Sequence, residues 1–206
     1  RPTGGLATAA TFSFYGNKIL TCGEGGAITL NDPQLETRVR TLRGQGADPR
    51  RQYYFPVTGY NFRLTNLAAA LLCGQLERHG EILATRRALF SAYQEQLAGI
   101  PGLGFQPVAC WAEPAPWLFS ITVDEARYGH SRDEVREMLK AHGFETRPFF
   151  HPLHHLPPFH EASRSRGEHL PITDRLAASG MNLPTFNGLT FEEIEALSTA
   201  IRRFQH

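Results

Sequence analysis

A long helical segment in the middle of the chain, residues 65–100, constrains the fold most strongly. Thr65 is a suitable N-cap, Leu67 to Leu72 is apolar on every side as in a buried helix, and Gly80 is expected to bend the segment. Ile100-Pro101-Gly102 ends it. Strand-forming sequence lies on both sides of this segment, so we predict two strand-containing parts with helices between them.

The part before the segment has two predicted strands and one helix. Ala10–Tyr15 and Ala27–Leu30 are rich in β-forming residues, and Gly23–Gly26 is a turn between them. Asp32 and Pro33 then fit the N-cap and first position of a helix that runs to about Leu42. Residues 43–60 lack periodicity, and a loop of this length is usually functional or disordered.

The part after the segment is predicted to be a smaller α+β unit. Capping boxes at Ser131 and Thr190 predict two helices, the first of which ends at Gly143. Residues 151–160 are predicted as a loop stiffened by proline. The remaining predicted elements are strands over Phe105–Trp111, Trp117–Val123, Phe144–Phe150 and Met181–Leu183, and a short helix over Ile172–Ser179.

Composition excludes several functional classes. The 206 residues are 41% hydrophobic and 20% charged, with a net charge of +1, which disfavours disorder and gives no field for DNA or an anionic membrane. No apolar run approaches the roughly 20 residues of a membrane span. The 3 cysteines fit neither a disulfide framework nor a metal knuckle, so we expect a reducing cytoplasm and no signal peptide. An arginine- and tyrosine-rich stretch, 38–54, fits nucleic acid or the phosphates of a small nucleotide equally well.

Lysine is scarce in this chain, so each lysine is considered for a specific role. Of the 21 basic residues, only Lys18 and Lys140 are lysines. Lys140 falls in a charged helical stretch and is predicted to be solvated. Lys18 follows a predicted strand between apolar neighbours, where a lowered pKa would make its amine a nucleophile toward carbonyls. The alternative for Lys18 is a side chain that extends from a strand end into water.

Histidines and glycines give two weaker candidates. His151, His154, His155 and His160 cluster in the 151–160 loop, but their spacing fits no zinc pattern. We therefore expect a histidine-lined polar pocket and no metal site. The Gly23–Gly26 turn with Ser13 could bind an anion, although a tight turn between strands is the favoured explanation.

The order of these motifs resembles the DegT/DnrJ/EryC1/StrS family of PLP-dependent sugar aminotransferases. Phe12–Gly26 looks like the family's lysine motif, and Gly59–Asn66 is similar to its second signature. Met181–Pro184 followed by Gly188–Thr190 is similar to the C-terminal signature. Within the family, the chain most resembles members that act on a GDP-linked sugar, and the stretches that support this are Arg43–Pro49 and Glu145–Phe150.

The resemblance implies a role for each matching residue. Lys18 would form a Schiff base with pyridoxal 5'-phosphate (PLP) and then transfer a proton, and Ser13 would bind the cofactor's phosphate. Asn61, supported by Arg63, would reach the phosphate bound in the partner subunit of a homodimer. The nucleotide sugar would contact residues of the turn and of the second part, namely Asn17, Arg147, Phe149 and His154.

The resemblance also implies an architecture and a reaction. The fold would be α/β, the C-terminal part of a fold-type-I enzyme. Residues 1–64 would be the C-terminal edge of the large PLP-binding domain, 65–100 the linking helix and 101–206 the small domain. Glutamate would aminate the cofactor, and a 4-keto-6-deoxy sugar nucleotide, best GDP-4-keto-6-deoxymannose, would take the amine. One alternative is that the sugar substrate is UDP- or dTDP-linked. The other is that the chain is a non-catalytic fragment with a binding or regulatory role.

Two features depart from the family pattern. The chain starts at Arg1 within a loop-like stretch and is about half the family's length, so we expect a piece of a longer protein. The missing half would carry the glycine-threonine phosphate turn, the ring stacked on PLP and the aspartate at the pyridine nitrogen. His151 stands where the relatives on GDP-linked sugars are expected to have tyrosine.

Overall fold

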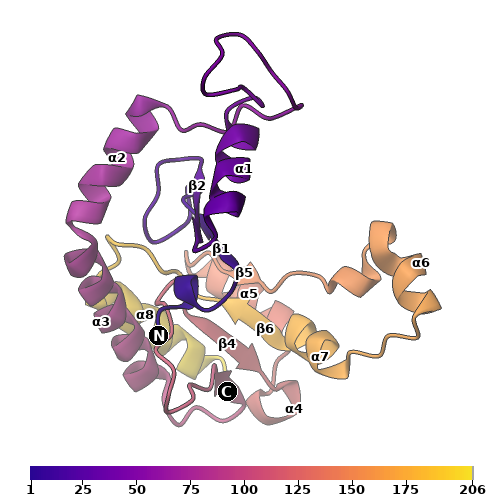
Figure 1. Cartoon of the computed structure of the whole chain (residues 1–206). Helices are drawn as coiled ribbons and strands as arrows, with labels where there is room; N and C mark the ends of the chain where they lie inside the picture. The colour runs from indigo at the N-terminus through magenta and orange to yellow at the C-terminus, as the bar shows by residue number, and fades with distance from the viewer. Residues whose placement is uncertain (206) are drawn as a thin grey trace. The chain divides into compact units, whose positions relative to one another are not determined.

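The chain folds as two units, Arg1–Glu81 and Ile82–His206, and a computed structural model describes residues 1–205 of it (Figure 1). Each unit is described by itself. The predicted division into the edge of a large domain (1–64), a linking helix (65–100) and a small domain (101–206) stays a prediction.

The first unit is built on an antiparallel hairpin. β1 (Ala9–Ser13) pairs with β2 (Gly26–Leu30) in the register Ala9↔Leu30 to Ser13↔Gly26, after a short 3-10 turn, η1 (Thr3–Gly5). α1 (Pro33–Arg43) follows, and the Asp32 carboxylate accepts hydrogen bonds from the backbone N–H groups of Gln34 and Leu35. The predicted hairpin strands, N-cap and first-turn proline are all confirmed.

The central helical segment is divided into two helices. α2 (Asn66–Glu77) begins after Thr65, whose hydroxyl accepts the N–H of Ala68, so the predicted N-cap is confirmed. α3 (His79–Leu97) starts two residues later, and Arg78 between them has φ −102° and ψ 10°. The break therefore lies just before Gly80, which was expected to bend the segment and is instead the second residue of α3.

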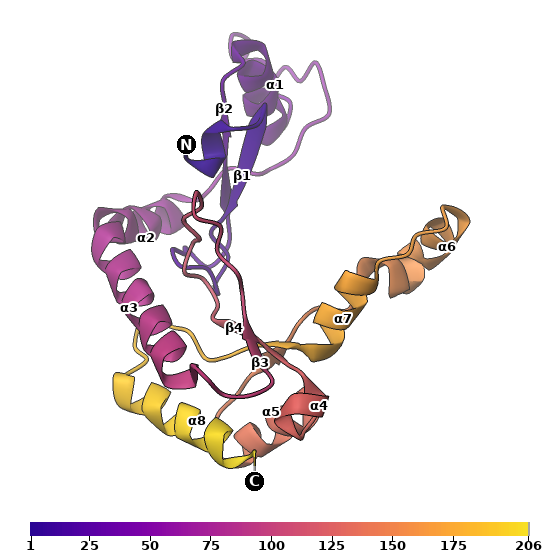
Figure 2. The ribbon, with the colours of Figure 1, turned by 90° about the horizontal axis from the view of Figure 1, so that it is seen from below.

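The second unit contains a four-stranded antiparallel sheet in the order β3-β4-β6-β5. Its strands are β3 (Leu103–Phe105), β4 (Ser120–Val123), β5 (Arg147–Pro148) and β6 (Gly180–Asn182). Its helices, besides α3, are α4 (Glu125–Tyr128), α5 (Arg132–Ala141), η2 (Leu153–His155), α6 (Pro157–Ser165), α7 (Pro171–Ser179) and α8 (Phe191–Arg203). Figures 1 and 2 both show α6 projecting away from the sheet beyond α7.

The core of the second unit fills the space between the sheet and helices α3, α5 and α8. Tyr93 of α3, Ile121 of β4 and Met181 of β6 are each at most 1% exposed. α5 and α8 carry both predicted capping boxes, which are confirmed. Other buried members of this cluster are Leu89, Leu97, Phe119, Val123, Tyr128, Val135, Leu139, Leu183, Ile194, Leu197 and Ile201. The sequence motif Met181–Pro184 thus begins in the hydrophobic core.

Four predictions for this unit are wrong in extent. The strand predicted over Phe105–Trp111 ends at Phe105, that over Trp117–Val123 begins only at Ser120, and that over Phe144–Phe150 is reduced to Arg147–Pro148. Proline explains much of this, because Pro107 and Pro148 cannot donate a hydrogen bond to a sheet. The predicted loop 151–160 holds η2 and the start of α6, where the adjacent prolines Pro157 and Pro158 occupy the first turn, in which helix N–H groups lack intrahelical partners.

Arg86 of α3 provides a test of how the second unit is held together. Arg86 is 5% exposed, and its guanidinium donates to the Asn187 side chain (2.7 Å) and to the backbone carbonyls of Thr185 (2.5 Å) and Trp117 (3.3 Å). Burial lowers its pKa. We predict that Arg86→Ala lowers the free energy of unfolding by about 2–4 kcal/mol, because three acceptors lose their donor and a buried side chain is removed. Arg87→Ala, which removes an exposed pair with Glu113, is the control and should change it by under about 1 kcal/mol in urea unfolding.

Acid should weaken the cap of α5. The Glu134 carboxylate accepts from the backbone N–H (2.7 Å) and the hydroxyl (2.8 Å) of Ser131, and the backbone hydrogen bond is the main reason that its pKa lies below the ordinary 4.5. A depressed pKa means that the stabilisation is present above pH 4.5 and is lost as the pH falls below it. We predict that the urea midpoint falls less between pH 5 and pH 3 in Glu134→Gln than in the unaltered chain. Glu137→Gln, on the same helix but outside the cap, is the matched control, and equal behaviour of both variants would contradict this.

Candidate functional site

The turn after β1 carries Lys18 in a hydrogen-bonded frame. The backbone N–H of Lys18 donates to the Tyr15 carbonyl (2.9 Å), and its side chain is half-buried. The Phe14 carbonyl accepts both the N–H of Cys22 (3.1 Å) and the hydroxyl of Thr21 (2.9 Å). These contacts close the loop between Phe14 and Cys22, so Lys18 is held at the end of the strand and not on a free arm.

The side-chain amide of Gln75 ties this loop to α2. Its carbonyl oxygen accepts the N–H of Thr21 (2.9 Å), and its amide nitrogen donates to the Thr21 carbonyl (2.7 Å). A primary amide that pairs with both backbone groups of one residue fixes that residue in the way a neighbouring strand would. The position of the Lys18 loop within the first unit therefore depends on one helix side chain.

The glycines after the loop serve the hairpin. Gly25 has φ +133°, and a Cβ there would lie 2.6 Å from the Leu64 side chain. A Cβ on Gly26 would lie 2.6 Å from the Phe12 carbonyl oxygen. There is no room for a side chain at either position, so the tight turn between the two strands explains these glycines. Ser13, at the end of β1, accepts a long hydrogen bond (3.4 Å) from the Tyr15 N–H and has an exposed side chain.

The segment with Asn61 and Arg63 lies alongside the end of α1. Gly44 and Asn61 form an antiparallel bridge, and the Phe62 N–H donates to the Arg43 carbonyl (3.1 Å). The approach is so close that a Cβ on Gly59 would lie 2.1 Å from the backbone nitrogen of Gly46. The loop 43–60 is thus folded back on itself, with Asn61 and Arg63 exposed at its end.

An open cavity of about 1300 Å³ lies within the first unit. Its lining comes from both hairpin strands, the glycine turn, α1 and residues 60–65, with Arg63 and the charged pair Glu36 and Arg40 among them. Lys18, Ser13 and Asn61 are not part of this lining. The structure therefore places Ser13 at the end of β1 with Asn17 and Lys18 on the turn that follows, and Asn61 and Arg63 on another segment. Of these five residues, only Arg63 lines the cavity.

The predicted substrate residues of the second unit lie at and beyond the edge strand β5. Arg147 pairs with Asn182 across β5 and β6, and its side chain is exposed. The Phe149 N–H donates to the Gly180 carbonyl (3.0 Å), and a Cβ on Gly180 would lie 2.2 Å from the Phe149 ring. Phe149 is thus packed against β6 while Arg147 faces solvent.

His154 lies on η2 beside His155 and the α7 residue Asp174. The Nε2 atoms of both imidazoles are 2.9 Å from the same oxygen, Asp174 Oδ1. His154 is mostly covered, and its Nδ1 is the ring nitrogen left for another partner. His151 and His160 are outside this group. Of the four histidines predicted to line one pocket, two therefore cluster, and a carboxylate joins them.

Sequence reasoning missed two polar residues that fix these segments. Gln75 was hidden in an apolar helix, although its position as the polar residue between Leu72 and Leu76 was a usable signal. Asp174 gave no signal, because it lies 19 residues from His155 and only the fold brings them together. Within residues 1–205, no helix has both the length and the apolar character that crossing a bilayer requires.

The chain is similar to known sugar aminotransferases over nearly all of its length. Residues 1–202 match the model of the DegT/DnrJ/EryC1/StrS aminotransferase family. The chain is 41% identical over 202 residues to the GDP-perosamine synthase of Caulobacter vibrioides, covering 98% of this chain and 53% of that protein. The chain therefore spans about half the length of the curated relatives it matches.

Solved structures of similar proteins give the same coverage. An X-ray structure of S. venezuelae DesV in complex with a ketimine intermediate has a TM-score of 0.88 and 32% identity, covering 100% of this chain and 53% of that one. A structure of DesI in the presence of its TDP-sugar product has a TM-score of 0.87 and 33% identity, covering 100% of this chain and 51% of that one.

The Gln75 contact with the Lys18 loop can be tested directly. We predict that Gln75→Ala speeds amide hydrogen exchange in residues 14–24 by about tenfold or more, because two hydrogen bonds to Thr21 are lost. Hydrogen-exchange mass spectrometry measures this. Gln94→Ala, at an exposed position on α3, is the matched control. Unchanged exchange in peptides covering 14–24 would show that the loop is held by its own backbone contacts alone.

Proposed function

Because the chain belongs to the DegT/DnrJ/EryC1/StrS aminotransferase family, we propose that it forms the C-terminal half of an enzyme that aminates a keto sugar nucleotide. Aminotransferases of this family are PLP-dependent, and the fold is the C-terminal part of fold-type-I. The amino donor in this proposal is glutamate, and the acceptor is a 4-keto-6-deoxy sugar nucleotide. The enzyme would work in the cytoplasm as a homodimer with shared active sites.

The sugar assignment rests on one comparison. The 41% identity to a GDP-perosamine synthase extends over 98% of the chain and includes both units. We therefore take GDP-4-keto-6-deoxymannose as the substrate and GDP-perosamine as the product. The 33% identity to DesI, whose structure was determined with a TDP-sugar product, supports a dTDP-linked keto sugar as the second candidate.

The residues present fit part of the PLP cofactor. Lys18 is half-buried on a loop that Gln75 anchors, and Ser13 is exposed at the strand end nearby in sequence. A lysine amine and a hydroxyl are suitable partners for an aldehyde and a phosphate, respectively. Asn61 and Arg63, exposed on a separate segment, suit a contact with the phosphate in a partner subunit.

Each of these residues has a defined part in the proposed mechanism. The cofactor supplies an electron sink for amino transfer when bound. Lys18 Nζ would hold the cofactor at the cofactor's aldehyde carbon and, as a free amine, would accept and return a proton. Ser13 Oγ would bind its phosphate. Asn17, Arg147, Phe149 and His154 would orient the nucleotide sugar, with Arg147 the residue suited to its phosphates.

The first unit also exposes apolar side chains that a partner segment would cover. Phe62, Leu67 and Leu71 are 71%, 81% and 61% exposed, respectively. Such exposure on neighbouring elements is typical of surfaces that pack against another chain or segment. We propose that the N-terminal half of the enzyme covers this face and supplies the remaining PLP contacts.

The two lysines of the chain offer a matched pair for testing this function. The test joins the chain to the N-terminal half of the Caulobacter vibrioides GDP-perosamine synthase and assays amino transfer from glutamate. We predict turnover with GDP-4-keto-6-deoxymannose, a loss of about a thousandfold or more in Lys18→Ala, and unchanged turnover in Lys140→Ala.

Other outcomes of this assay separate the alternatives. Turnover with only a UDP- or dTDP-linked keto sugar would keep the family chemistry and replace the proposed sugar. Full activity in Lys18→Ala would contradict the mechanism. A correctly folded chimera that binds nucleotide sugar without turning it over would favour a binding or regulatory module.

The isolated chain should bind PLP weakly, since this proposal assigns the remaining PLP contacts to the N-terminal half of the enzyme. We expect no stable visible absorption band when PLP is added to the 206-residue chain at micromolar concentration. A stable band that disappears in Lys18→Ala and persists in Lys140→Ala would show that this half alone is sufficient.

A further inference from the structure

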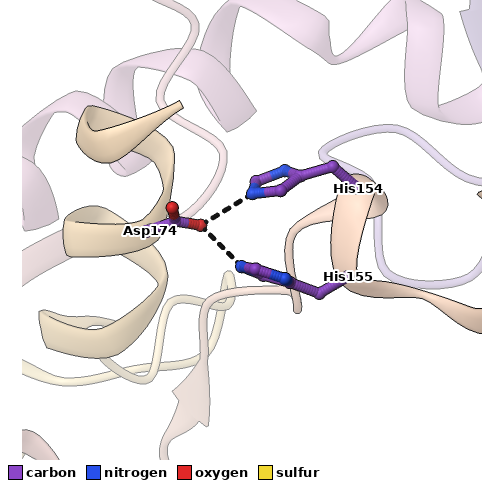
Figure 3. A group of neighbouring side chains, drawn as sticks. All are labelled: His154, His155 and Asp174. Atoms are coloured by element: carbon purple, nitrogen blue, oxygen red, sulfur yellow. Dashed lines mark hydrogen bonds and ion pairs between the residues drawn. The ribbon is translucent and has the colours of Figure 1, made fainter. Parts of the chain in front are cut away.

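The cluster on η2 and α7 has the donor set and convergence of a metal site. His154 Nε2 and His155 Nε2 are each 2.9 Å from Asp174 Oδ1, and the three donor atoms all lie within 4.8 Å of one another (Figure 3). The two imidazole rings are close, with centroids 4.1 Å apart and planes inclined by 43°. Figure 3 shows both rings pointing from η2 toward the carboxylate on α7.

Contrary to the expectation from the histidine spacing alone, we propose that His154, His155 and Asp174 bind a divalent transition-metal ion such as Zn²⁺ and leave at least one coordination position open. Two imidazole nitrogens and one carboxylate oxygen are ligands that zinc accepts in protein sites. Tetrahedral bonds of about 2.0–2.1 Å place ligand atoms roughly 3.3 Å apart, slightly more than the 2.9 Å contacts. Small side-chain rotations would therefore open room for the ion.

The backbone around the cluster restricts how far the ligands can spread. The His155 N–H donates to the Pro152 carbonyl (3.0 Å), and the Leu156 N–H donates to the Leu153 carbonyl (3.0 Å), which closes η2. Asp174 lies in the first turn of α7, and its N–H donates to the Leu170 carbonyl (3.1 Å). Both ligand-bearing segments are thus fixed by their own hydrogen bonds.

Exposure around the cluster favours an ion with an open position. The side chain of His154 is 11% exposed, whereas those of Asp174 and His155 are 41% and 54% exposed, so one side of the cluster faces solvent.

The alternative is that Asp174 only clamps the two imidazoles by hydrogen bonding. Such a clamp would stabilise the fold equally in the presence of a chelator and of zinc. A metal site would instead raise the melting temperature with zinc concentration, since a ligand that binds the folded state stabilises it by mass action. Zinc dependence therefore distinguishes the two.

Calorimetric titration of the full chain with ZnCl₂ tests the proposal. Exposed Cys73 and Cys110 are replaced by serine in all samples, because their thiols would also bind zinc. We expect one zinc per chain, with affinity weakened about tenfold or more in His155→Gln and in Asp174→Asn. His151→Gln and His169→Gln, two histidines outside the cluster, should leave the affinity unchanged.

Retention of fold in the variants is checked by far-UV circular dichroism, and Co²⁺ serves as a second probe whose visible spectrum reports its ligands. The proposal is overturned if zinc leaves the melting temperature of the unaltered chain unchanged. It is also overturned if all four histidine and aspartate variants weaken binding alike, which would indicate diffuse binding to surface histidines. None of these readouts depends on aminotransferase activity.

Discussion

The pairing of the Gln75 amide with the backbone of Thr21 is the contact on which the proposed chemistry depends. It joins the loop that carries Lys18 to α2, through two hydrogen bonds of 2.9 and 2.7 Å. A lysine side chain is a flexible four-carbon stem, so its amine is positioned accurately for catalysis only when the backbone that carries it is fixed. In this chain the backbone is fixed by the contacts of Phe14 with Thr21 and Cys22 from within and by Gln75 from the neighbouring helix.

The two units differ in how completely they bury their apolar residues. The second unit has a continuous core in which Tyr93, Val135 and Ile194 are fully buried. In the first unit, α2 buries Leu72 but exposes Leu67 and Leu71. The chain also spans about half the length of its curated relatives. The proposal that this face packs against the other half of the enzyme accounts for both observations.

Local signals in the sequence were enough to predict most elements, because the capping residues Asp32, Thr65, Ser131 and Thr190 make contacts within a few positions of themselves. Strand lengths around Pro107 and Pro148 were overestimated, since apolar residues there are interrupted by a residue that cannot donate to a sheet. The motifs identified the family but not the geometry. The partners of Thr21 and His155 lie 54 and 19 residues away, and only tertiary structure brings them into contact. The roles of Ser13, Lys18, Asn61 and Arg63 follow from resemblance and stay proposals.

The central claim is that Lys18, and no other amine of the chain, bears the cofactor. Borohydride reduction traps a covalent link between PLP and an amine, and peptide mass spectrometry then locates the labelled residue. Applied to the chain assembled with an N-terminal half, the account predicts a stoichiometric pyridoxyl label on the peptide that contains Lys18. A label found mainly on Lys140, or divided between the two lysines, would contradict it.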